Sequence, residues 1–290
     1  MVKGIGTVRQ KEILDAYDTY STQYANQLGL VSSGRTQELF GQINQEMHPM
    51  IIQNLFWMVL NLNDRRIQFT AGLKDALGYN DIQPTFNGLP IRDMLSWINP
   101  HRLQLFLQFA HASYAASIQY RNLISEGSYP CYRIRVPMKH SNGNYYWVYQ
   151  SSFPLEVDDQ GMMISQVNQH FMGHPYKGEL LEPPELLFKS IGFSKIRDGL
   201  MMEARQYFRH ILDIRFDPIH GKIFEIYFQN PEAGIKDIER ITGWKSMDIK
   251  NYQRKILRIA SEYFHYPFTT CKEAVHYLHR IGWQYEVLRE

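Results

Sequence analysis

The chain has 290 residues, 44% of them hydrophobic and 21% charged, and its 31 basic and 29 acidic side chains leave a formal net charge of +2. This is the composition of an ordinary globular protein of about two domains, and any surface that attracts nucleic acid must be local. Its two cysteines, Cys131 and Cys271, lie far apart in the sequence. They exclude a disulfide framework and a cysteine-based metal cluster, and they favour a reducing compartment.

The N-terminal segment is predicted to be a helical lead. Apolar side chains recur there at spacings of three and four, which is typical of one helical stripe, at Leu14, Tyr17, Tyr20, Tyr24 and Leu28. A second helix is expected from Thr36. The start of the chain lacks the apolar core of a signal peptide, and the longest apolar run, MIIQNLFWMVLNL, is too short to span a bilayer. We therefore expect a soluble cytoplasmic protein without membrane contacts.

Strands with frequent turns are predicted between about residues 55 and 172. FWMVLNLNDRRIQF reads as strand, turn and strand, with Asn63-Asp64 at the turn, where Asx side chains satisfy backbone groups locally. A long helix begins at Pro100. Two further strands flank SNGN, because an Asn-Gly pair between alternating runs is the strongest short hairpin signal. MMISQVNQHFM fits a last strand.

These pieces carry a resemblance to a known family. LKDALGY, INPHRLQLFLQ and YRIRVPMKHSNGNYYWV follow one another in the chain, and in this order they resemble a PAS domain with its Arg-rich strand, Asn-Gly turn and Trp-Val strand. The resemblance covers about residues 50–172. It implies a five-stranded antiparallel sheet with helices over one face, and a sensory or dimerisation role that answers to a small-molecule or protein signal.

The aromatic residues of this domain allow two interpretations. A filled core is the simpler one, because aromatic side chains dominate cores; a ligand pocket on the inner side of the sheet is the other. The Asn-Cys-Arg-like motif of a photoreactive flavin domain is absent, and His111 on the long helix is the candidate for a haem iron. No cofactor is predicted, although a coloured haem or flavin protein stays a third class of function. The candidate pocket residues are Trp57, Phe69, Tyr79, Phe109, His111, Tyr132 and Trp147.

No enzyme site is predicted. The sequence contains no Gly-rich phosphate loop, no GxSxG and no HExxH. His276 and His279 lie one helical turn apart in CKEAVHYLH, but no carboxylate or cysteine pair has matching spacing. A solvated helix face explains them better than a metal site.

The C-terminal part reads as helical throughout. FDPIHGKIFEIYFQN begins with Asp217 as the N-cap and Pro218 at the first helical position. GIKDIERITG is a short helix with three isoleucines on one side, closed by Gly243. In the last helix, Thr270 and Glu273 form a capping-box pattern.

The helix from Ser246 to about Tyr263 separates apolar from basic residues. At about 100° per residue, its core side would hold Ile249, Tyr252, Ile256, Ile259 and Tyr263 within an arc of about 80°. The opposite side is basic: Lys245 to Arg258 contains five basic residues and one acid, a local charge of +4 that exceeds that of the whole chain. A solvated surface helix would show this pattern, and so would a helix that lies in a groove of DNA.

The order of the C-terminal helices resembles the LuxR/GerE-type helix-turn-helix over about residues 214–283. IKDIERITGWKSMDIKNYQRKILRIA stands for the paired helices and TTCKEAVHYLHRIGW for the closing helix. This chain departs from the family at Glu239, where a small residue is usual, and at Lys245 and Asp248, where Ser and Thr are usual. The resemblance implies an all-α DNA-binding domain.

Together these features predict an α+β protein that acts as a PAS-linked transcriptional regulator. It would bind double-stranded DNA as a homodimer, because paired helices match two half-sites. The alternative is a protein-interaction or dimerisation module without sequence-specific DNA binding. The expected divisions are a helical lead (1–49), a PAS-like domain (50–172), a linker with connecting helices (173–213) and a helix-turn-helix domain (214–290). The candidate DNA-binding residues are Lys245, Ser246, Asp248, Lys250, Asn251, Arg254, Lys255 and Arg258.

Overall fold

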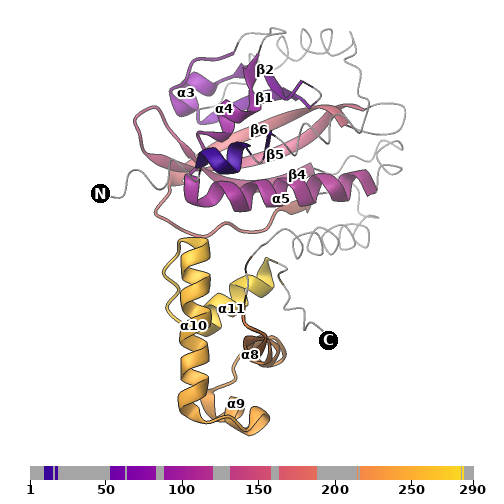
Figure 1. The fold of residues 1–290 in the computed structure, drawn as a ribbon. Coiled ribbons are helices and arrows are strands. Elements are labelled where there is room, and N and C mark those ends of the chain that lie inside the picture. Colours follow the sequence, from indigo (N-terminus) through magenta and orange to yellow (C-terminus); the bar gives the residue numbers. More distant parts are fainter. Residues whose placement is uncertain are drawn as a thin grey trace. The chain divides into compact units, whose positions relative to one another are not determined.

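A computed structural model gives the fold (Figure 1). It describes residues 10–15, 17–18, 53–62, 64–82, 88–119, 131–157, 163–187, 214, 216–281 and 283. The chain forms two units. The sheet unit contains Met1–Lys177 and Pro184–Met201, and the helical unit contains Gly178–Pro183 and Met202–Glu290. The helix expected from Thr36, Asn63 of the first turn and the connection at 188–213 lie outside the described residues.

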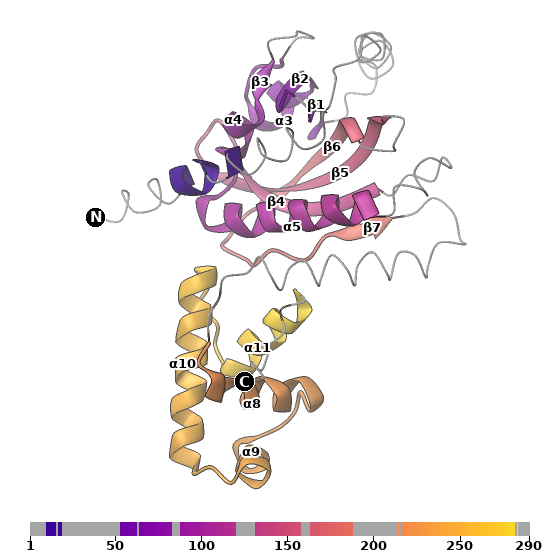
Figure 2. The same ribbon diagram turned by 45° about the vertical axis from the view of Figure 1, so that its right-hand side comes forward.

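In the described residues, the sheet unit is built on one antiparallel sheet of seven strands in the order β3-β2-β1-β6-β5-β4-β7. Its helices α3 and α5 pack against β1 and β4, respectively, and Figure 2 shows α5 running along β4. The strands are β1 (Leu55–Asn61), β2 (Arg66–Ala71), β3 (Leu89–Pro90), β4 (Cys131–Lys139), β5 (Tyr145–Val157), β6 (Met163–Pro175) and β7 (Glu185–Leu187). The helices are α3 (Leu73–Leu77), α4 (Ile91–Leu95) and α5 (Pro100–Gln119).

The α+β class is confirmed, and the expected number of five strands is corrected to seven. The five longer strands, β2, β1, β6, β5 and β4, are those that the sequence pattern located. The two others lie at the sheet edges, where β3 pairs with β2 and β7 with β4. They have two and three residues, too few to show an alternating pattern. Part of the segment expected as a linker therefore belongs to the sheet, because β6 continues to Pro175 and β7 follows.

The hairpin predicted at SNGN is confirmed. It joins β4 to β5, with Lys139 paired to Tyr145. The Asn142 side chain accepts a hydrogen bond from the Asn144 N–H at 2.9 Å, and Gly143 has a φ of 91°, which a glycine adopts without strain.

The two faces of the sheet follow from the strand register, because successive side chains point to opposite sides. One face, called the buried face, carries Phe56 and Met58 of β1 with His170 of β6, all fully buried. The other, called the groove face, carries Leu55 and Trp57 of β1 with Phe171 and Gln169 of β6 as their partners.

Residues 10–15 and 17–18 are helical and belong to the same unit. Its Leu14 is buried, and Asp15 and Asp18 both form ion pairs with Arg92 of α4. Gln10 donates to the backbone oxygen of Ser96 at 3.1 Å. This part of the predicted stripe is helical and packed; Tyr20, Tyr24 and Leu28 lie outside the described residues.

The helical unit contains α8 (Pro218–Gln229), α9 (Ile235–Thr242), α10 (Ser246–Phe264) and α11 (Cys271–Arg280). Its core is largely aromatic: Phe216 and Trp283 pack on Phe224 with ring centroids 4.8 and 4.9 Å away. The Tyr277 hydroxyl donates to the Leu181 carbonyl at 2.9 Å, which joins Gly178–Pro183 to the unit. None of the described helices is long and apolar enough to cross a membrane.

The predicted helix caps are present, with one difference. Asp217 accepts from the Ile219 N–H at 3.1 Å, and Thr270 accepts from the Glu273 N–H at 3.1 Å. The Glu273 carboxylate, however, accepts from the N–H and the hydroxyl of Thr269, one residue earlier than a capping box requires.

Candidate functional site

The connection between α9 and α10 is short and sharply defined. Gly243 ends α9 with a φ of 72°, and its N–H donates to the Glu239 carbonyl at 2.8 Å. The Thr242 hydroxyl accepts from the Trp244 N–H at 3.1 Å, and α10 begins at Ser246. The predicted bounds of this helix are thereby confirmed to within one residue.

One side of α10 is fixed to the rest of the helical unit. Ile249, Ile256, Ala260 and Phe264 are buried. The Gln253 amide donates to the Tyr227 hydroxyl of α8 at 2.6 Å, which holds the rotation of α10 about its axis. Ile259, expected in the core, is only half-buried, because Ala260 occupies the position nearest the other helices.

The opposite side of α10 carries the predicted DNA-binding residues. Seven of the eight are exposed and Ser246 is half-buried, so seven of them are accessible to solvent along α10 and at its N-cap. Lys245 is the N-cap residue, but its side chain makes no capping hydrogen bond. Within the described residues, Asp248 forms no ion pair with either Lys245 or Lys250, a pairing that would have neutralised part of this face.

The basic residues of α10 differ from those of its neighbours. Several cations of the neighbouring helices are paired with carboxylates, as for Lys222 with Glu225 at 2.8 Å and Arg240 with Asp237 at 3.1 Å. Among the residues that the structure describes, Arg254, Lys255 and Arg258 form no such pair. Their charge is therefore available to a polyanion.

Two exposed apolar residues flank the connection between α9 and α10. Neither was among the binding residues predicted from the sequence. Ile241, in the last turn of α9, is 51% exposed, and Met247, in the first turn of α10, is 67% exposed. Ile241 was expected to lie with Ile238 on the packed side of α9, but of the two only Ile238 is buried.

The seven candidate pocket residues of the sheet unit do not lie on one face. The strand register places three of them, Trp57, Phe69 and Trp147, on the groove face. Their side chains therefore point away from the buried face. The other side chains have different surroundings: Tyr132 lies on the buried face, Tyr79 stacks on Trp97 at 4.4 Å and Phe109 is buried on α5. His111 is part of α5, but its side chain is outside the described residues.

The buried face holds four polar residues that were not predicted from the sequence, called the polar row: Gln150, Ser152, Asn168 and His170. Gln150 and His170 are cross-strand partners, and so are Ser152 and Asn168. The His170 ring stacks on Phe56 with centroids 4.5 Å apart. Neither of its nitrogens has a well-formed hydrogen bond in the described part of the chain, and burial lowers the pKa of His170 to about 3, opposed weakly by a backbone contact at Asn168. Alternation alone could have located this row once the inner face was known.

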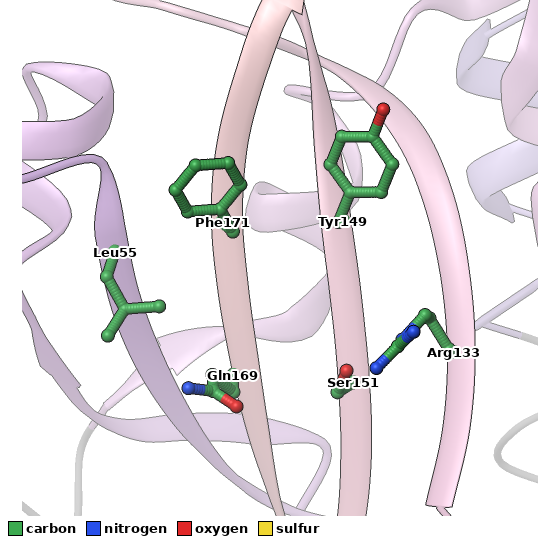
Figure 3. Close-up of a pocket in the computed structure, with 6 residues that line it drawn as sticks. All are labelled: Leu55, Arg133, Tyr149, Ser151, Gln169 and Phe171. Atoms are coloured by element: carbon green, nitrogen blue, oxygen red, sulfur yellow. The ribbon is translucent and has the colours of Figure 1, made fainter. Parts of the chain in front are cut away.

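The groove face is open to solvent at one place. A groove of about 320 Å³ is lined there by an apolar row and a polar row, which Figure 3 shows side by side. The apolar row contains Leu55, Phe171 and Tyr149, and the polar row Gln169, Ser151 and Arg133. Phe171 is 47% exposed, and an aromatic side chain this exposed is suited to a contact.

No group of three or more His, Cys, Asp or Glu side chains in the described residues is placed to hold a metal ion. Cys271 is a free, buried thiol, and its burial raises its pKa to about 12. A thiol in this environment is an apolar core group, since the nucleophile is the thiolate.

No family model matches the chain, and no curated protein matches it. Several solved structures are similar at low identity. The phage VqmA–DPO complex is 10% identical over 82% of this chain and 87% of that one, with a TM-score of 0.26. The Vibrio cholerae VqmA complex with ligand and DNA is 12% identical over 85% and 92%, with a TM-score of 0.26. The N-terminal domain of a Marinobacter aquaeolei diguanylate cyclase with PAS/PAC sensor is 13% identical over 41% and 94%, with a TM-score of 0.29. Similarity at these TM-scores does not establish a shared fold.

Proposed function

We propose that this chain is a transcriptional regulator in which a PAS-like sheet unit is joined to a LuxR/GerE-type helix-turn-helix. The observation that carries the proposal is the free side of α10, where exposed cations that form no ion pair with any described carboxylate lie opposite buried Ile249 and Ile256. A short helix, a three-residue connection and a longer basic helix present such a surface to the major groove of DNA.

The proposed DNA-binding residues fall into two groups by their position along α10. Lys245, Ser246, Asp248, Lys250 and Asn251 lie in the first turns, which reach base edges when a helix enters the groove by its N-terminus. Arg254, Lys255 and Arg258 lie further along and suit phosphates, which position a protein without reading sequence.

The test is a titration of duplex DNA at several salt concentrations. The double variant Arg254→Ala/Lys255→Ala should weaken binding to all duplexes and reduce the salt slope by about two, because each lost phosphate contact reduces it by about one. Lys222→Ala/Lys272→Ala is the matched control, since it removes the same charge from α8 and α11 and should leave the slope unchanged. An unchanged slope in the α10 variant would mean that this face is only solvated.

Base reading is tested separately by Asn251→Ala. An amide can bind both adenine N6 and N7, and its loss should cost about 1–3 kcal/mol at the preferred site while relaxing base choice there. A preferred site obtained by selection from random DNA supplies the probe. A uniform loss on all duplexes would assign Asn251 to the phosphate group instead.

A second candidate, a protein-interaction module, is favoured by exposed Phe171 in the groove face. The occupant that we propose is a second copy of the chain, because a two-fold axis would set the apolar row of one copy against that of the other. Phe171→Asp should shift sedimentation toward the monomer, whereas His174→Asp, exposed on the same strand, should not. A wild-type monomer at tens of micromolar, with no dimer on DNA, would exclude this interface and the homodimer.

A further inference from the structure

Met247 is the most exposed large apolar side chain among the described residues. Four such side chains are exposed by more than a third, and Met247, at 67%, exceeds Ile241, Phe171 and Ile219. Single exposed apolar residues are common on protein surfaces. This one, however, lies in the first turn of the helix assigned above to DNA, beside exposed Asp248 and Lys250.

The position of Met247 on the helix excludes a role in the core. At about 100° per residue, it lies about 160° from Ile249 around the α10 axis, and Ile249 is fully buried. The same arithmetic places Asn251, Arg254 and Arg258 within about 40° of Met247. The side chain therefore stands on the line of the polar residues that face away from the unit.

The chemistry of the side chain limits what it can contact there. A thioether donates no hydrogen bond and is only a weak acceptor, so it cannot bind phosphate or pair with a base edge. The apolar group in the major groove is the C5-methyl of thymine. A long, unbranched and polarizable side chain can adapt to that methyl group.

We infer that Met247 is a specificity-determining residue that reads thymine through its methyl group, at a position of the site next to the one contacted by Asn251. This inference rests on the proposed DNA-binding function. It adds an apolar contact to a face otherwise described by charge and hydrogen bonds, and it gives the exposed methionine a role that a solvated helix would not need.

The test replaces each thymine of the selected site, one at a time, by deoxyuridine, which pairs identically and lacks only the methyl group. For the wild-type chain, one such replacement per half-site should weaken binding about fourfold, the value of one buried methyl group. The Met247→Ala variant should bind thymine and uracil equally at that position, with an unchanged salt slope. Ile219→Ala, another exposed apolar residue of the same unit, is the matched control and should keep the fourfold difference.

The outcomes separate this inference from the proposed function. If wild-type protein binds duplex DNA with a steep salt slope but is insensitive to every methyl group, DNA binding stands and the inference is overturned. If the sensitivity survives in Met247→Ala, another residue reads the methyl group and the inference is also overturned. If neither protein binds duplex DNA in a salt-dependent way, the proposed function fails first.

Discussion

The two units of the molecule bury different chemistry. Among the described residues, ten polar side chains are buried; nine belong to the sheet unit, and only His220 belongs to the helical unit. The helical unit instead packs aromatic rings inside and turns its charges outward on α10. The nine in the sheet unit are Asn61, Gln68, Thr70, Arg102, Gln108, Gln150, Ser165, Asn168 and His170.

This difference indicates where each unit is expected to interact. A buried polar group without a partner costs about 1–3 kcal/mol, so the polar row at His170 and Asn168 weakens the sheet unit unless something contacts it. Charges on α10 cost little because water solvates them, and His220 is the one buried polar side chain among the described residues of the helical unit. We therefore expect substitutions to change the stability of the helical unit mainly through its packing, and that of the sheet unit also through its buried polar groups.

The largest effect is expected in the aromatic core of the helical unit. Phe224 is fully buried between Phe216 and Trp283, and Phe224→Ala should lower the free energy of unfolding by about 3–5 kcal/mol, because the site cannot collapse around the cavity. Urea titration followed by tryptophan fluorescence measures it. The exposed control Ile219→Ala should stay within about 0.5 kcal/mol of wild type. A cost for Phe224→Ala below about 1 kcal/mol would contradict the packing.

Two glycines with similar backbones sharpen the comparison. Gly72 in the sheet unit has a φ of 78°, and Gly243 in the helical unit 72°. A Cβ at Gly72 would lie 2.5 Å from the Leu55 carbonyl oxygen, whereas a Cβ at Gly243 would meet nothing within 4 Å. Gly243→Ala should cost about 1 kcal/mol from the positive φ alone. Gly72→Ala should cost at least about 2 kcal/mol, because backbone must also move. Equal shifts in the urea midpoint would mean that the backbone at the start of β1 moves without cost.

The sequence could predict the features that local patterns encode. The five longer strands, the Asn142-Gly143 hairpin and the bounds of α10 follow from alternation, turn chemistry and helical period, and all are confirmed. The edge strands β3 and β7 could not be predicted, because their pairing partners are distant and their two or three residues carry no period.

The candidate sites were predictable to different degrees. The free side of α10 could be located because its buried and its exposed residues belong to one helix, and a helical projection separates the two sets. The polar row could be located only once the inner face of the sheet was known, because it joins Gln150 of β5 to His170 of β6 through register. Register also decides which of the two alternating sets is buried: Phe56 is fully buried, whereas Trp57, the next residue, lies on the groove face.

The polar row makes stability depend on pH in the sheet unit. Burial lowers the pKa of His170 to about 3 from the usual 6.5. Below pH 6.5 the unfolded chain takes up a proton that the folded chain does not, so stability is complete above pH 6.5 and declines as the pH falls toward 3. By pH 5 the loss should be about 2 kcal/mol.

The pH effect is measured by urea midpoints at pH 7 and pH 5. His170→Gln should remove this part of the pH dependence, and His174→Gln, exposed on the same strand, should keep it. The same slope in His170→Gln and wild type would place the titrating group elsewhere.

The smallest effect concerns the start of α10, where the helical unit departs from its own pattern. Asp217 and Thr270 cap α8 and α11 with side-chain hydrogen bonds, while Lys245 begins α10 without one. Its positive charge also lies at the positive end of the helix dipole. Lys245→Ser should therefore raise the free energy of unfolding by about 0.5–1 kcal/mol, since serine can accept from the orphan amides.

The same change should weaken duplex DNA binding and reduce the salt slope by up to about one, because Lys245 is one of the residues proposed to contact DNA. Lys236→Ser is the matched control: it removes an equal charge near the start of α9, where Asp237 already accepts from the Gly234 N–H at 3.0 Å, and it should not add a cap. Chemical denaturation and binding titration on both variants give the answer. A Lys245→Ser protein that is more stable and binds DNA as well as wild type would show that this lysine is dispensable for the contact, and the uncapped helix start would then have no functional reason.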